Sequence, residues 1–209
     1  KKPPAVLAET LRGYDNVTVV PGDILKINIP ETLGLKEGQR FKVVANLPYY
    51  ITTPIIMTLL EQRLPIERLV TMVQKEVAMR MTAQPRSKDY GALSLAVQYF
   101  TAPRMVMDVP PRAFRPAPEV TSAVVACIVR ESPSVAPRSE KLFFRLIRAA
   151  FGQRRKTLPN ALVGAGLTKD AAQAALRAAG IAGSTRGEQL SLEDFARISD
   201  AVGDLPGQG

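Results

Sequence analysis

The chain of 209 residues contains no histidine, no tryptophan and a single cysteine, Cys127. Without histidine, Ser-His-Asp and Cys-His catalysis are excluded, as are metal sites that need an imidazole ligand. One cysteine excludes an internal disulfide and argues against a structural zinc ion, so we expect no metal. Cys127 lies in the apolar run 123–129, which favours a buried structural thiol over a nucleophile. Any chemistry must therefore depend on positioning, stacking and hydrogen bonding.

Long apolar runs are also absent, because no stretch approaches the roughly 18 consecutive apolar residues of a membrane span. The first four residues, Lys-Lys-Pro-Pro, lack the apolar centre of a secretory signal. The single cysteine fits a reducing compartment. We therefore predict a cytoplasmic protein without a membrane partner.

What the chain does have is an excess of positive charge, with 28 basic and 19 acidic residues and a net charge of +9. Such a balance favours a polyanionic partner, nucleic acid above all, although a basic surface alone is weak evidence. The hydrophobic content of 46% supports a proper core. The length suits one sizeable domain, or one domain with a small appendage.

Apolar runs and helical patterns alternate along the first part of the chain. Strands are predicted at 17–20, 41–45, 68–73, 104–109 and 120–130. Helices are predicted at 3–12, 75–83 and 92–100. A further helix is predicted to begin with Thr53 as its cap and Pro54 in its first turn. Residues 26–39 are predicted to form a loop with one helical turn. This order predicts an α/β fold with a mainly parallel sheet wrapped on both faces. The last two strands, joined by a proline-rich loop, predict an antiparallel pair at one edge.

The composition changes at residues 132–137, Ser-Pro-Ser-Val-Ala-Pro, which we interpret as a linker. The chain beyond it is alanine-rich and predicts helices at about 139–151, 155–163, 168–179 and 191–200. We therefore divide the chain into a first domain at 1–131 and a small all-α domain at 138–209.

The turn Asn46-Leu47-Pro48-Tyr49 directly follows the predicted strand 41–45. In open α/β sheets, ligands bind at the carboxyl ends of the strands. The Asn46 side-chain oxygen and a main-chain carbonyl fixed by Pro48 can both accept from an exocyclic amine, and the ring of Tyr49 can stack on a base. The turn is therefore suited to methylating an amino nitrogen.

Two further candidates lie in loops. Asp23 follows a strand pattern and a Pro-Gly turn, where a carboxylate could bind a nucleoside, but a simple turn aspartate is the favoured interpretation of this residue alone. Phe114 lies in a proline-rich loop between Arg112 and Arg115. It could stack on a flipped base or plug the loop onto the core, and its sequence favours neither.

Basic residues dominate the segment 138–156, which holds seven basic residues and one acidic one. A charged helix face is usually only solvated. Here the charge has almost one sign, so we favour contact with phosphates. The candidate RNA-binding residues are Arg145, Arg148, Arg154, Arg155 and Lys156, together with Arg112 and Arg115.

Several motifs in register resemble those of the ribosomal RNA adenine N6-dimethyltransferases. The resemblance runs from about Asp15 to about Phe195 and is strongest toward the bacterial small-subunit branch. The motifs are Val-Val-Ala-Asn-Leu-Pro-Tyr-Tyr at 43–50, Gln-Lys-Glu-Val-Ala-Met-Arg at 74–80, Tyr-Gly-Ala-Leu-Ser at 90–94, Phe114-x-Pro116-x-Pro118-x-Val120-x-Ser122, and Phe151-x-x-Arg154-Arg155-Lys156-Thr157-Leu158-x-Asn160.

The resemblance implies a Rossmann-like class I methyltransferase sheet and S-adenosylmethionine as methyl donor. By the family pattern, Asp23 accepts from the amino group of the donor's adenine, Ile24 adds a backbone contact, and Asn46 lies beside the donor. Asn46 and the Leu47-Pro48 backbone accept from N6 of the target adenine, and Tyr49 and Phe114 stack on its two faces.

The resemblance also implies two adjacent adenosines of the 3′-terminal hairpin of 16S rRNA as substrate. The partner is then the small (30S) ribosomal subunit, and we expect a monomer. One feature departs from the family pattern, because the glycine-rich loop after the first strand and the acidic residue after the second are not present. From this we expect the first βα unit to be missing.

Three rival functions fit parts of this pattern. A large-subunit rRNA adenine methyltransferase would share the fold, but the motifs after Phe114 and Phe151 favour the small-subunit branch. A non-catalytic RNA-binding assembly factor would explain the missing glycine loop, but not the turn at Asn46. A DNA amino-methyltransferase would use a similar turn, without a reason for the basic helical part.

Overall fold

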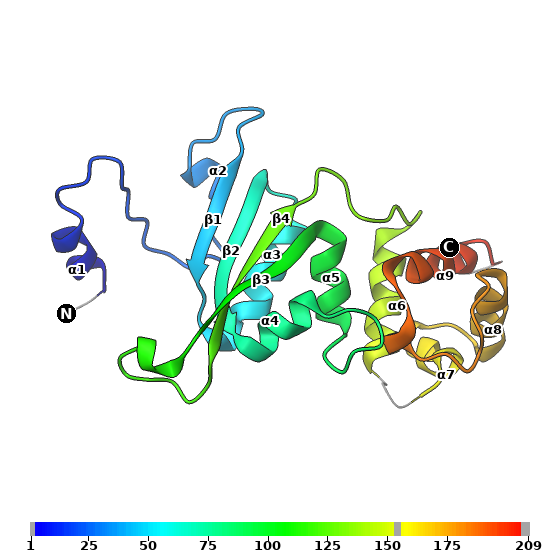
Figure 1. The fold of residues 1–209 in the computed structure, drawn as a ribbon. Helices are drawn as coiled ribbons and strands as arrows, with labels where there is room; N and C mark the ends of the chain where they lie inside the picture. Colours follow the sequence, from blue (N-terminus) through cyan, green and yellow to red (C-terminus); the bar gives the residue numbers. More distant parts are fainter. Residues whose placement is uncertain (1–2, 153–155, 206–209) are drawn as a thin grey trace. The chain divides into compact units, whose positions relative to one another are not determined.

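The computed structural model describes residues 3–152 and 156–205, with the side chains of Pro3 and Pro4 left aside. The chain divides into two compact units, one ending at Gln39 and one beginning at Arg40 (Figure 1). Each unit is described by itself.

The first unit contains two short helices, α1 (Pro3–Thr10) and α2 (Ile29–Thr32), joined by irregular chain. Asn28 caps α2, because its side-chain oxygen accepts from the Glu31 N–H. The prediction of a strand at 17–20 is wrong, since these residues form no regular structure. A strand needs a hydrogen-bonded neighbour, and no described segment pairs with this one, although its valines have the right propensity.

The second unit is built on a sheet of the order β1-β2-β4-β3. The strands are β1 (Phe41–Asn46), β2 (Ile66–Gln74), β3 (Thr101–Val109) and β4 (Ser122–Val129). β1 and β2 are parallel, whereas β2–β4 and β3–β4 are antiparallel. The predicted antiparallel edge pair is confirmed. The predicted mainly parallel sheet is not observed in the described strands, because β4 turns back between β2 and β3.

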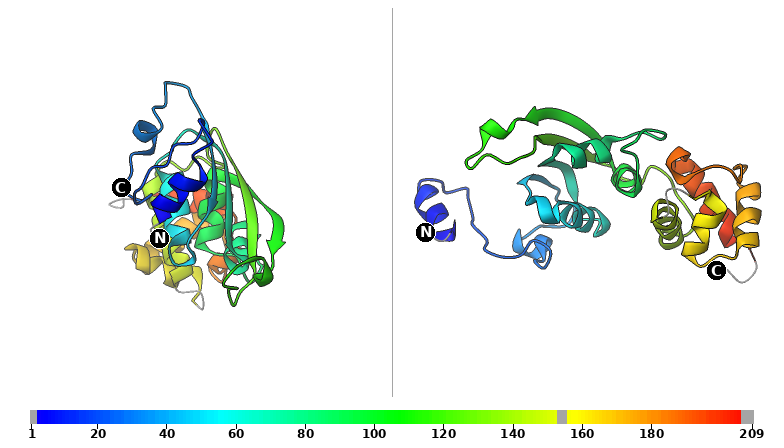
Figure 2. Two further views of the ribbon diagram at one scale, coloured as in Figure 1. Left: turned by 90° about the vertical axis from the view of Figure 1, so that its left-hand side faces the viewer. Right: turned by 90° about the horizontal axis from the view of Figure 1, so that it is seen from below.

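Helices α3 (Thr52–Glu61), α4 (Lys75–Thr82) and α5 (Ala92–Phe100) lie along one face of this sheet (Figure 2). Alternate strand residues on that face, such as Leu69, Val73 and Val125, are fully buried. On the opposite face Val44 is 82% exposed and Ile128 is 48% exposed. Cover on both faces, as predicted, is therefore not observed within this unit.

The start of α3 also differs from the prediction. A 3₁₀ turn at Tyr49–Ile51 leads directly into the helix, so Ile51 is the N-terminal cap and Thr53 already lies inside the first turn. The Thr52 hydroxyl instead donates to the Pro48 carbonyl over 2.9 Å. The predicted cap at Thr53 is wrong because the preceding turn supplies helical geometry two residues earlier.

The last part of the chain is helical, with α6 (Glu140–Gly152), α7 (Leu158–Leu162), α8 (Lys169–Ala178) and α9 (Leu192–Gly203). Thr168 caps α8 and Ser191 caps α9, because their side-chain oxygens accept from the N–H groups of Ala171 and Asp194. The core of this part includes Phe143, Leu158 and Phe195, all fully buried.

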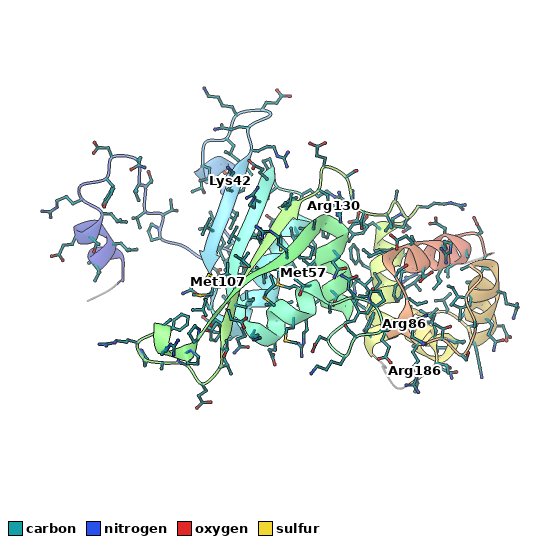
Figure 3. The ribbon with its side chains drawn as sticks, in the orientation of Figure 1. Lys42, Met57, Arg86, Met107, Arg130 and Arg186 are labelled. Carbon is teal, nitrogen blue, oxygen red and sulfur yellow. The ribbon has the colours of Figure 1, made fainter. Side chains whose placement is uncertain are left out.

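Specific hydrogen bonds join this helical part to the sheet part of the same unit. The Tyr90 hydroxyl donates to the Leu190 carbonyl over 2.8 Å. The backbone N–H of Arg86 donates to the Glu188 carbonyl over 2.8 Å. Arg86 is labelled in Figure 3. The Tyr99 hydroxyl donates to Glu140 at the start of α6 over 2.9 Å. The two parts are therefore in direct contact, and the division into domains at 132–137 stays a prediction.

Candidate active site at the end of strand β1

The parallel pair β1–β2 delivers the turn Asn46–Tyr49 at the carboxyl end of β1. Asn46 is the last residue of β1, pairs in register with Met72 and is exposed. Alternation along β1 places it on the same open face of the sheet as Val44. Its side-chain amide makes no hydrogen bond with another described residue, so both the oxygen and the nitrogen can bind a ligand.

The backbone of the turn is held by Leu47 and Pro48. The Leu47 side chain is buried, and its N–H donates to the Met72 carbonyl over 3.3 Å. The Pro48 carbonyl accepts from the Ile51 N–H over 3.2 Å and from the Thr52 hydroxyl over 2.9 Å. These two bonds use the acceptor capacity of Pro48. The Leu47 carbonyl accepts no hydrogen bond within the described chain, so it is the main-chain acceptor that this turn offers.

Tyr49 is held through its hydroxyl, which lies 2.5 Å from the Ser122 Oγ. Ser122 is fully buried and begins β4, where it pairs with Gln74 on one side and Val109 on the other. The position of the Tyr49 ring is therefore set by the sheet as well as by its own turn.

The loop that carries Phe114 starts and ends beside this contact. β3 ends at Val109, which is the register partner of Ser122, so both ends of the loop 110–121 meet there. A short 3₁₀ turn, Pro111–Ala113, precedes Phe114, whose N–H donates to the Pro111 carbonyl over 3.1 Å. Phe114 is half-buried, and it makes no ring contact with Tyr49 in the described structure. Arg112 and Arg115 are both exposed on this loop.

Lys75 belongs to the motif at 74–80, but the sequence analysis assigned no role to it. In the structure it fixes the end of the same loop. Its N–H donates to the Thr121 carbonyl over 2.9 Å, and its Nζ lies 2.6 Å from the Asp108 Oδ2. Sequence reasoning also gave no role to Ser122 or Thr52. The only available signal was that Lys75 and Ser122 belong to the quoted motifs, because their contacts join distant parts of the chain, whereas Thr52 contacts the nearby Pro48.

Asp23 and Ile24 belong to the first compact unit and are described there alone. The Asp23 Oδ1 accepts from the Leu25 N–H over 3.0 Å, and its Oδ2 lies 3.8 Å from the Lys26 Nζ. Asp23 is exposed, and Ile24 is 39% exposed. The Ile24 N–H donates to no acceptor among the described residues. An exposed carboxylate next to an open N–H fits the amino group and ring nitrogen of an adenine.

The predicted basic face of α6 is present. Arg145 and Arg148 are exposed, while Leu142 and Leu146 on the other side of the helix are buried. Neither arginine forms an ion pair within the described part of the chain. Lys156 is exposed. Arg154 and Arg155 lie outside the described residues.

The chemistry of Cys127 agrees with its interpretation as a structural thiol. Burial raises the pKa of the Cys127 thiol to about 11, which keeps it protonated and unreactive near neutral pH. Among the residues described, no cluster of carboxylates or cysteine is arranged to hold a metal ion. No described helix is both long enough and apolar enough to span a bilayer.

Comparison with known proteins points to one family. The family described as "Ribosomal RNA adenine dimethylase" matches residues 4–204. "Ribosomal RNA small subunit methyltransferase A" of Moorella thermoacetica is 52% identical over 201 residues, which cover 93% of this chain and 70% of that protein. The protein of the same name from Lachnoclostridium phytofermentans is 49% identical over 203 residues, covering 95% of this chain and 70% of that protein.

Two solved structures have a similar fold. A dimethyladenosine transferase from Plasmodium falciparum superposes with a TM-score of 0.72 at 26% identity, covering 90% of this chain and 73% of that one. The 23S rRNA methyltransferase ErmE superposes with a TM-score of 0.66 at 24% identity, covering 96% and 78%. At that identity the second comparison supports the fold alone.

Proposed function

The chain belongs to the ribosomal RNA adenine dimethylase family, and we propose that its turn Asn46–Tyr49 binds the target adenine and presents N6 for methylation. The family confirms the resemblance read from the motifs. It also gives the activity, which is S-adenosylmethionine-dependent dimethylation of adenine in the rRNA of the small subunit. The finer proposal is that the substrate is two adjacent adenosines of the 3′-terminal hairpin of 16S rRNA.

The observation that carries the proposal is the pair of acceptors in this turn. The Asn46 Oδ1 and the Leu47 carbonyl are both open, whereas the Pro48 carbonyl is already bonded to Ile51 and Thr52. An exocyclic amine has two N–H groups and needs two acceptors. We therefore assign N6 to Asn46 and Leu47, and we assign to Pro48 the role of fixing the turn.

These acceptors address the main chemical difficulty of the reaction. The N6 lone pair is delocalised into the purine, so the nitrogen is a poor nucleophile. Hydrogen bonds from both N–H groups to the Asn46 and Leu47 oxygens favour a pyramidal nitrogen with a localised lone pair, and proximity and orientation supply the catalysis. When bound, S-adenosylmethionine supplies an electrophilic methyl group. No histidine or other strong base is needed, because the methylated nitrogen is acidic enough to lose its proton to water.

The second methylation makes a further demand on the same turn. After the first transfer, N6 carries one N–H, so one acceptor loses its donor and a methyl group must take that place. Asn46 is exposed on the open face of the sheet, where its side chain can move to admit a methyl group. We assign the fixed contact of the second round to the Leu47 carbonyl, which belongs to the anchored backbone.

The remaining candidate residues have the roles that the family pattern implies. Tyr49 and Phe114 stack on the two faces of the flipped adenine. Asp23 and Ile24 hold the adenine of the methyl donor. The phosphates of the RNA are contacted by basic side chains, namely Arg112, Arg115, Arg145, Arg148, Arg154, Arg155 and Lys156. The partner is the small ribosomal subunit, on which the protein acts as a monomer in the cytoplasm.

A methyl-transfer assay tests this proposal. The protein is incubated with labelled S-adenosylmethionine and small subunits that lack the modification, and the modified nucleotides are identified and mapped. Two dimethylated adenosines in the 3′-terminal hairpin of 16S rRNA are expected. Methylation of large-subunit rRNA instead would favour the rival target, and binding without any product would favour a non-catalytic assembly factor.

A further inference from the structure

We infer that Ser122 is a positioning residue for the methyl transfer, because it holds the hydroxyl of Tyr49 and so fixes the plane against which the target adenine stacks. This inference rests on the proposed function of Tyr49. It concerns a residue 73 positions away along the chain, on a different strand and outside the turn itself.

The contact is short, and one partner is buried within the sheet. The two hydroxyl oxygens are 2.5 Å apart, at the short end of O–H···O hydrogen bonds. Ser122 is fully buried at the first position of β4, with Gln74 and Val109 as neighbours on both sides. Serine has a single side-chain torsion, so little freedom remains at this end of the bond.

The other anchors of the turn act on the backbone and leave the Tyr49 ring unfixed. Leu47 is held by burial and by the Met72 carbonyl, and Pro48 is held by Ile51 and Thr52. A tyrosine side chain can still rotate about two torsions. A hydrogen bond at the far end of the ring removes most of this freedom, and a preorganised ring costs less ordering when the base arrives.

Ser122 also joins the two surfaces that are proposed to stack on the base. The loop with Phe114 leaves the sheet at Val109 and returns at Ser122, and Lys75 holds its end through Thr121. A hydrogen bond between Tyr49 and Ser122 therefore gives both aromatic residues one common reference point in the sheet. Errors in their spacing would lower the fraction of bound adenines in reacting geometry.

A merely structural hydrogen bond would have other consequences. A buried hydroxyl usually needs a partner, so the contact could serve only the stability of β4. In that case, loss of the Ser122 hydroxyl would lower the melting temperature and leave the turnover of the folded enzyme unchanged. The positioning role instead predicts a loss in kcat that depends on the presence of the Tyr49 hydroxyl.

The test is a double-mutant cycle of Ser122→Ala and Tyr49→Phe in the methyl-transfer assay. Each single variant is expected to lower kcat about tenfold with KM changed less than about twofold, and the double variant to lose no more than either single one. Multiplying losses would overturn the inference, as would an unchanged kcat in both single variants. If Ser122→Ala does not fold, an unchanged kcat in Tyr49→Phe overturns it alone.

Ser199→Ala provides the matched control. Ser199 is also a fully buried serine, but it lies on α9 and its hydroxyl has no partner in the described chain. Its kcat is expected to equal that of the unmodified protein. The proposed function is checked separately in the same assay, and it fails if the unmodified protein makes no dimethyladenosine. If the unmodified protein is active and the Ser122→Ala variant is equally active, only the inference about Ser122 is refuted.

Discussion

The turn at the end of β1 and the basic face of α6 both belong to the second unit, but they are built in opposite ways. In the turn, most polar groups are already bonded to the protein, and the open acceptors on Asn46 and Leu47 remain. On α6, Arg145 and Arg148 are exposed and make no ion pair among the described residues. The turn is therefore suited to one ligand geometry, whereas the helix face is suited to a flexible chain of phosphates. Chemistry and affinity can therefore be tested separately, by substitutions in the turn and on the helix face.

The largest effect is expected from removing the side-chain acceptor, which is one of the two open acceptors of the turn. Asn46→Ala should lower kcat by about 10²–10³-fold, as for loss of one preorganised catalytic hydrogen bond, and should change RNA affinity less than about twofold. Turnover and equilibrium binding of the rRNA are measured separately. Asn16→Ala, at an exposed asparagine of the first unit, is the control and should be silent. Equal losses of turnover and affinity would remove the distinction between the two regions.

A smaller effect is expected from the stacking surface. Phe114→Leu should lower kcat/KM about tenfold, because base–aromatic stacking contributes about 1–3 kcal/mol. The melting temperature should change little, since Phe114 is only half-buried. Activity and thermal unfolding are measured on the same preparation. A fall in melting temperature of more than about 4 °C would identify Phe114 as part of the core instead.

The basic face should respond in the reverse manner. Replacing Arg145 and Arg148 together by Gln should weaken rRNA binding several-fold and lower the slope of log K against log salt by about 2. The kcat at saturating RNA should stay unchanged. Affinity is measured over a series of salt concentrations. The control replaces Lys169 and Arg177, two exposed cations of α8, by Gln. If the two double variants have the same salt slope, the α6 face contributes no more to RNA binding than the control cations do, and it is only a solvated surface.

The smallest effect concerns the contact between the helical part and the sheet part. Burial, and then the hydrogen bond with Glu140, raise the pKa of Tyr99 to about 12. A raised pKa in the folded state means that this contribution to stability is complete below pH 10 and is lost as the pH rises from 10 to 12. The melting temperature should therefore fall over this range. Tyr99→Phe should have a flatter dependence, and an unchanged slope would exclude this residue as a cause.

Local sequence signals predicted one helix and one strand closely. The helix at 92–100 has the predicted bounds, and β1 is predicted to within one residue because a β-branched run ends in a Pro-containing turn. The strand at 17–20 had the same kind of signal and failed, since a strand also requires a neighbour that its own sequence does not specify. The Thr53 cap failed because the helix start depends on the turn before it.

The candidate site was predictable in its residues and not in their connections. Asn46, Leu47 and Tyr49 follow from the chemistry of a strand-end turn. The bond between Tyr49 and Ser122 joins two strands that are far apart in the sequence, and no local pattern specifies it. The bond from the Thr52 hydroxyl to the Pro48 carbonyl spans only four residues, but it depends on the 3₁₀ turn at Tyr49–Ile51, and it decides which carbonyl of the turn stays open.

That commitment of the Pro48 carbonyl has a consequence for fidelity. The Leu47 carbonyl is a main-chain lone pair that cannot turn into a donor, unlike a side-chain amide, which can rotate to present its nitrogen. Guanine, hypoxanthine and uracil would each bring a carbonyl oxygen to the place of the adenine amine, and two oxygens facing each other without a proton repel. With the proposed assignment of N6 to Leu47, the backbone of the turn would therefore reject these bases by electrostatic repulsion, so that base identity would be read twice, once by attraction and once by repulsion.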